Sequence, residues 1–130
     1  MIRALERVGP ARASARLAPL EDAARRAAAQ LEAGDLDGWG ATLRDATDAI
    51  GGLHPDLVGR SARAAIDVAR ALGARGWKVN GAGGDGGSVT VLAPPEPPAR
   101  AALAEALGRL PGARLLPLRL ADEGLVCRLA

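Results

Sequence analysis

The chain has 130 residues, of which 48% are apolar, and this size and composition favour one folded domain and exclude a disordered tail. Its 17 basic and 15 acidic residues nearly cancel, leave a formal charge of +2, and are mixed along the sequence. Nucleic-acid binding usually requires a clustered basic face, and single-strand binding also requires stacking aromatic side chains, so the composition argues against both.

The N-terminal segment, residues 1–16, is rich in arginine and poor in acids, which is a feature of organellar transit peptides. The same bias towards alanine and arginine continues through the rest of the chain, which favours a general compositional bias over a transit peptide. We expect a poorly defined segment at 1–16 followed by one domain at 17–130. No apolar run approaches the ~18 residues of a membrane span. The single cysteine, Cys127, permits no internal disulfide, and together these features predict a cytoplasmic protein without a membrane partner.

Two helices are predicted in the first half of the domain, because apolar residues there recur at helical spacing. The first runs over residues 20–31 and ends at Gly34, a residue typical of helix ends. Asp35 is a suitable N-cap for the second helix, whose apolar face extends over residues 36–50.

Two further helices follow. One begins after His54 and Pro55 and ends at Gly73, and the other follows the sequence PPEPP and covers residues 99–110. The apolar face of the former is expected to contain Leu57, Ser61, Ala65, Val68 and Leu72.

Four segments alternate with the period of a β-strand: residues 77–80, 88–93, 115–120 and 125–129. Pro117 cannot donate a ladder hydrogen bond, so the third strand is expected at a sheet edge or at a bulge. Short connections within each pair favour antiparallel hairpins. We therefore expect an α+β fold, a ferredoxin-like four-stranded antiparallel sheet with packed helices, preceded by a helical region.

The segment between the first two strands contains five glycines in seven positions, Gly81 to Gly87. It satisfies the pattern G-x-G-x-x-G, but a strand rather than a helix follows it, which excludes the dinucleotide-binding interpretation. A Walker A loop would need a lysine before Ser88, and the sequence has Gly87 there. A hairpin turn uses one or two glycines, so this number favours a loop that approaches a ligand or another chain closely.

The sequence WKVNGAGGDGGSVTVL resembles the third motif of the GHMP kinases, the family of galactokinase, homoserine kinase and mevalonate kinase. The motif positions are matched by Lys78, Gly81, Ala82, Gly83, Gly84, Gly86 and Gly87. The helical segments before the motif are also similar to those of the family, so that the resemblance extends from about Leu20 to the end.

This resemblance implies the C-terminal half of an ATP- and Mg²⁺-dependent kinase that phosphorylates a small hydroxyl-bearing acceptor, with a sugar or sugar phosphate favoured. The family's N-terminal domain, with its ATP-phosphate motif of the type Pro-x-x-x-Gly-Leu-Gly-Ser-Ser-Ala, has no counterpart in this sequence. The resemblance thus implies a missing or separate N-terminal partner domain, and no activity of the chain alone. Loss of that partner would leave an apolar face open to self-association. The alternative is a stand-alone binding or regulatory module without catalysis.

Asp85 departs from the family pattern. A carboxylate would repel a phosphate, so Asp85 is expected to point away, bind a metal, or meet an acceptor hydroxyl, and the last is favoured. Lys78 is either a phosphate ligand or a solvated lysine, whereas Asn80 and His54 are expected to have structural roles. No catalytic residue is assigned, and no cluster of His, Cys, Asp and Glu has the spacing of metal ligands. The predicted phosphate or substrate loop comprises Lys78, Asn80, Gly81, Ala82, Gly83, Gly84, Asp85, Gly86 and Gly87.

Overall fold

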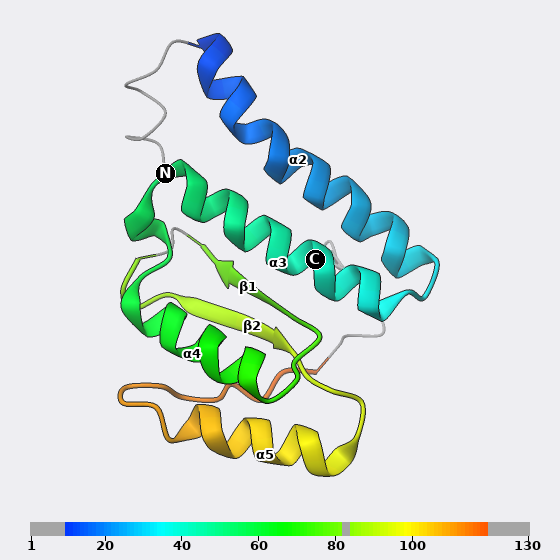
Figure 1. The fold of residues 1–130 in the computed structure, drawn as a ribbon, viewed down its shortest axis with the longest axis vertical. Coiled ribbons are helices and arrows are strands. Elements are labelled where there is room, and N and C mark those ends of the chain that lie inside the picture. The colour runs from blue at the N-terminus through cyan, green and yellow to red at the C-terminus, as the bar shows by residue number, and fades with distance from the viewer. Residues whose placement is uncertain (1–9, 82–83, 120–130) are drawn as a thin grey trace, which may run out of the picture.

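The fold is α+β, and the computed structural model describes it for residues 10–81 and 84–119 (Figure 1). Within these residues two long helices come first, then a short 3-10 turn, a third helix, a β-hairpin and a last helix. Their bounds are α2 Pro10–Glu32, α3 Leu36–Leu53, η1 Pro55–Leu57, α4 Arg60–Ala71, β1 Gly76–Asn80, β2 Ser88–Leu92 and α5 Pro97–Gly108.

The helices α2 and α3 form an antiparallel pair along one side of the molecule (Figure 1). Gly34 reverses the chain between them in a left-handed conformation, with φ of 71°. The Asp35 carboxylate then accepts a hydrogen bond from Gly38 N at 2.9 Å and caps α3, as the sequence predicts. The helix α2 begins at Pro10 and so crosses the expected boundary between residues 16 and 17, while the division into segments stays a prediction.

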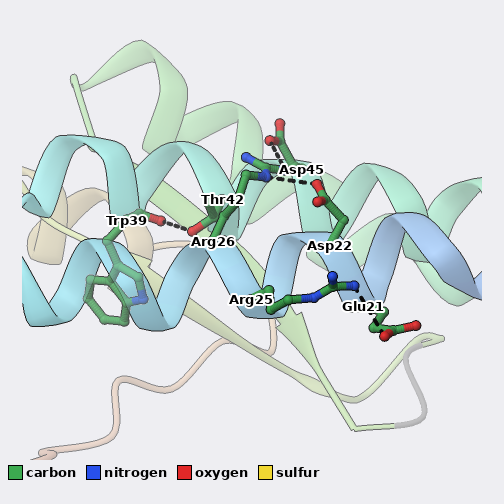
Figure 2. Close-up of polar contacts among 7 residues, drawn as sticks. All are labelled: Glu21, Asp22, Arg25, Arg26, Trp39, Thr42 and Asp45. Carbon is green, nitrogen blue, oxygen red and sulfur yellow. Dashed lines mark hydrogen bonds and ion pairs between the residues drawn. The ribbon is translucent and has the colours of Figure 1, made fainter.

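Polar contacts join the exposed sides of this helix pair (Figure 2). Arg26 on α2 binds Asp22 at 2.8 Å and, across to α3, Asp45 at 2.9 Å. Hydrogen bonding, first to Asp22 and then to Asp45, raises the pKa of Arg26 above its ordinary value. Arg16 donates to the carbonyl oxygens of Gly52 and Leu53 at the end of α3. Because exposed ion pairs are screened by water, they orient the helices more than they stabilise them.

The hairpin β1–β2 is antiparallel, with Trp77 opposite Val91 and Val79 opposite Val89, which confirms the first predicted strand pair. Trp77 and Val79 are buried, and they belong to a core that α4 and α5 complete from one face of the hairpin. The buried members of this core are Val58, Ala62, Ile66, Ala69, Trp77, Val79 and Leu103.

The helix α3 lies along the edge of β1 that is not paired with β2. Thr47 is buried there: its hydroxyl accepts a hydrogen bond from Val79 N at 3.3 Å. Its single proton is shared between two carbonyl oxygens, that of Trp77 at 3.2 Å and that of Leu43 at 3.1 Å. A helix side chain thus satisfies strand backbone groups that a neighbouring strand would otherwise bind.

Close approach of two backbones makes this contact possible. A Cβ added to Gly40 on α3 would lie 2.5 Å from the carbonyl oxygen of Arg75, and a Cβ added to Gly76 would collide with Gly40 itself. Arg44 donates to the same Arg75 carbonyl from the next turn of α3. The contact therefore requires residues without side chains at both positions.

The predicted four-stranded ferredoxin-like sheet is wrong for the described residues, whose sheet has two strands. The segment 115–119, where the third strand was expected, is irregular and exposed, with Leu118 79% accessible. Its leucines occur at both odd and even positions, so the segment has no single apolar face to bury, and Pro117 lacks a donor. The fourth predicted strand, 125–129 with Cys127, lies outside the described residues.

The predicted apolar face of α4 is shifted by one residue. Ala62, Ile66 and Ala69 are buried, whereas Ser61 and Leu72 are exposed. The predicted face left out Ile66, the largest apolar side chain of α4, which packs into the core together with Ala62 and Ala69. In the described part of the chain, no helix combines the length and apolar composition that crossing a bilayer requires.

We predict that Gly40→Ala lowers the free energy of unfolding by about 1–3 kcal/mol, because the new methyl group displaces the Arg75 backbone. Gly52→Ala is the matched control on the same helix, where a Cβ meets nothing within 4 Å. It should leave stability unchanged or raise it by up to about 1 kcal/mol. Urea denaturation of both variants measures the difference, and equal effects would contradict the proposed backbone contact.

We predict that Thr47→Val costs about 1–3 kcal/mol, because it leaves the buried Val79 N without its hydrogen-bond acceptor. Thr42→Val is the control: Thr42 is as deeply buried, but its hydroxyl donates only to Trp39 O in its own helix, at 2.7 Å (Figure 2). In urea denaturation, Thr47→Val should have a clearly lower free energy of unfolding than Thr42→Val. If the two variants lose the same stability, the strand-edge role of Thr47 is refuted.

Candidate functional site

The glycine-rich loop is anchored on the connection between α3 and α4. Gly84 N donates to the carbonyl oxygen of Leu57 at 3.1 Å, and Val58 and Gly84 form an isolated parallel β-bridge. A Cβ on Gly59 would lie 2.6 Å from the Gly84 backbone, so Gly59 permits this approach. The loop is therefore held by backbone contacts on the three residues that immediately precede α4.

Backbone conformation also explains why several positions of the loop are glycine. Gly81, Gly84 and Gly86 adopt φ values of 69°, 82° and 106°, in the region that side-chain-bearing residues rarely occupy. Nothing but open space surrounds a Cβ built on Gly81 or Gly86. Backbone conformation, rather than crowding, accounts for glycine at these two positions.

Asp85 contacts α4 directly. Its Oδ1 atom accepts a hydrogen bond from Ser61 N at 3.2 Å, one of the free backbone donors in the first turn of α4. The helix N-cap, Gly59, has no side chain to supply that acceptor, so a residue from the loop supplies it. The observed carboxylate oxygen thus serves the helix N-terminus, where a negative charge is also favoured by the helix dipole.

The other predicted loop residues lie on the hairpin. Asn80 Nδ2 donates to Thr90 Oγ1 at 2.9 Å and to Ser88 Oγ at 3.3 Å, so Asn80 braces β1 against β2. Lys78 is half-buried, and its Nζ donates to the Val79 carbonyl at 3.2 Å. Both side chains belong to the sheet face opposite to Trp77 and Val79, because neighbouring strand residues alternate.

The structure therefore brings most of the predicted site together. Lys78 and Asn80 lead into the loop, and Gly81, Gly84, Asp85, Gly86 and Gly87 form its described part. Ala82 and Gly83 lie outside the described residues. His54 is structural, as expected: its Nδ1 atom accepts from Asp56 N at 3.2 Å and caps the 3-10 turn.

A cleft of about 460 Å³ lies between α3 and α4, and sequence reasoning did not find it. Its floor includes Trp77 of β1, over whose ring the guanidinium carbons of Arg44 and Arg70 stand at 5.7 and 5.2 Å from the centroid. Only the spacing of charged residues on α4 could have indicated it, since they occur on every turn beside the buried face. The residues that line it are Thr47, Asp48, Gly51, Pro55, Val58, Arg63, Ile66, Asp67, Arg70 and Trp77.

Within residues 10–81 and 84–119, no three or more His, Cys, Asp and Glu side chains gather closely enough to hold a metal ion. Comparisons with models of known families, with curated proteins and with solved structures find no match for this chain. The resemblance to the GHMP kinases therefore stays a prediction from the motif residues.

We predict that Asp85→Ala lowers the free energy of unfolding by about 1 kcal/mol, the usual effect of removing a helix cap. Asp85→Asn keeps an acceptor oxygen and should lose less. Asp56→Ala is a control at a nearby aspartate whose side chain is 91% exposed, and it should change little. Thermal unfolding of the three variants measures these differences in stability. If Asp85→Ala unfolds at the same temperature as the wild-type chain, the cap is not formed in solution.

Proposed function

We propose that this chain is the C-terminal half of an ATP-dependent GHMP-type kinase that phosphorylates a small hydroxyl-bearing acceptor, a sugar or a sugar phosphate. The observation that carries the proposal is the glycine-rich loop between β1 and β2, whose residues match the family motif and which is docked on the N-terminus of α4. A loop anchored at both Gly84 and Asp85 is suited to hold a neighbouring phosphate-binding segment in place.

Phosphoryl transfer needs positioning and charge stabilisation more than covalent participation by the protein. In this proposal the loop supports the nucleotide-binding loop of an N-terminal half, and the helical hairpins form part of the acceptor pocket. The described residues do not fit Mg²⁺ or the ATP phosphates by themselves, because they contain no metal-binding cluster and Asp85 adds a negative charge to the loop. The proposal therefore assigns both to the N-terminal half.

The position of Asp85 modifies the expectation that it orients an acceptor hydroxyl. One of its oxygens is engaged by Ser61 N, and so its first effect on turnover is through the position of the loop. Asp85→Asn, which keeps the cap, separates the two roles. A loss of acceptor efficiency without a loss of stability would indicate contact with the acceptor.

We predict that the chain alone folds but does not transfer phosphate. Purified protein is incubated with MgATP and a panel of sugars, sugar phosphates, homoserine and mevalonate, and acceptor-dependent ADP formation is measured. Together with an N-terminal half that carries the phosphate motif, the chain should turn over, and Gly84→Val should reduce kcat at least about tenfold because valine cannot readily adopt the positive φ.

Gly52→Ala is the control for this assay, since a Cβ added at Gly52 meets no atom within 4 Å. Turnover by the chain alone that Gly84→Val abolishes would contradict the half-enzyme proposal. An upstream reading frame without the phosphate motif, and no separate gene that supplies it, would contradict the kinase proposal itself.

A stand-alone small-ligand-binding or regulatory module is the second candidate. The cleft between α3 and α4 favours it, because its volume of about 460 Å³ falls in the range of small-molecule sites and this chain alone provides every lining residue. Ligand binding by the isolated chain, without any nucleotide, distinguishes this candidate from the kinase.

A further inference from the structure

The cleft between α3 and α4 holds two charges that are not neutralised by an opposite charge within residues 10–81 and 84–119. Asp48 lies on the α3 wall and takes part in none of the ion pairs found there. Arg63 lies on the α4 wall and donates to the carbonyl oxygens of Val58 at 2.9 Å and Pro55 at 3.1 Å, which are neutral groups. By contrast, Arg70 and Asp67 form an ion pair at 3.1 Å.

Three core side chains reach the floor between these charges. Val58, Ile66 and Trp77 are each less than 10% exposed and form one side of the hydrophobic core. Gly51 contributes no side chain to the α3 wall, and a Cβ there would reach within 3.6 Å of Val58. The Thr47 hydroxyl, which also lines the cleft, is already bonded to the backbone of β1. The cleft thus has an arginine that no carboxylate neutralises on its α4 wall and an unpaired carboxylate on its α3 wall, with the edges of three core side chains between them.

We propose that this cleft binds a small zwitterion with an aliphatic side chain, an α-amino acid of about the size of leucine. The ligand carboxylate binds the guanidinium of Arg63, the ammonium group binds the carboxylate of Asp48, and the side chain lies over Val58 and Ile66. This site is separate from the glycine-rich loop and does not depend on the kinase proposal.

The charges and the aromatic ring argue against other ligand classes. A sugar phosphate would meet one free arginine but also Asp48 and Asp67, and a polyamine would meet Arg63 and Arg70. An aromatic ligand would have to displace Arg44 or Arg70 from Trp77 in order to stack on the ring. A ligand with one charge of each sign and an aliphatic group satisfies all three constraints.

The test is a titration of the ¹⁵N-labelled full chain with L-leucine, followed by amide and indole NMR signals. Leucine should shift the signals of Gly51, Asp67 and Trp77 in a saturable manner. N-acetyl-L-leucine lacks the ammonium group and L-leucinamide lacks the carboxylate, so each should bind at least about threefold more weakly. Arg63 is left unchanged because it also holds the connection between α3 and α4.

Asp48→Asn is the decisive variant, and Asp45→Asn is its matched control. Both residues are exposed on α3, but Asp45 pairs with Arg26 on α2 and does not line the cleft. Asp48→Asn should weaken leucine binding about three- to fivefold and should bind leucine and N-acetyl-leucine equally, whereas Asp45→Asn should behave as wild type. The proposal is overturned by the absence of saturable shifts up to about 20 mM leucine, by equal binding of N-acetyl-leucine to the wild-type chain, or by unchanged binding in Asp48→Asn.

Discussion

The contact between α3 and the free edge of β1 is the constraint on which the remaining structure depends. A two-stranded hairpin is marginal by itself, because half of its backbone groups have no partner. Thr47 and Arg44 supply partners from a helix, and the absence of side chains at Gly40 and Gly76 lets the helix come close enough. With β1 fixed in this way, alternation directs Trp77 and Val79 into the core and Lys78 and Asn80 to the opposite face.

The glycine-rich loop has a structural explanation that covers part of its composition. Positive φ angles require glycine at positions 81, 84 and 86, and the docking of the loop on α4 requires glycine at position 59. Asp85, the residue that departs from the family motif, completes the α4 N-terminus. A loop of this kind is therefore part of the fold as well as a candidate for phosphate-linked function, and the two roles are compatible since anchoring keeps the loop in one position.

Helical periodicity, strand-like alternation and helix-end signals were sufficient to predict the α+β class, the first hairpin and the Asp35 cap, because each depends on residues close in sequence. The prediction of a third strand failed because the alternation in residues 115–120 does not separate apolar from polar positions. Pro117 weakens strand formation further, since it lacks a backbone donor. The face of α4 was misplaced by one residue, since the alanines of this helix give little contrast between its faces and the prediction left Ile66 out. The cleft and the Asp85–Ser61 contact join residues distant in sequence, and no local pattern marks them.

Protection of one strand edge by α3 also bears on aggregation. An exposed strand edge is a template for pairing with other chains, and proteins reduce this hazard by covering the edge or by placing charge there. Here α3 covers the β1 side: the Thr47 hydroxyl bonds Val79 N and Trp77 O, and the Arg44 guanidinium bonds the carbonyl oxygen of Arg75 just before the strand. Any added strand, from this chain or another, has to approach from the β2 side. The hairpin therefore extends in one direction only, which disfavours the open-ended stacking that produces fibrils.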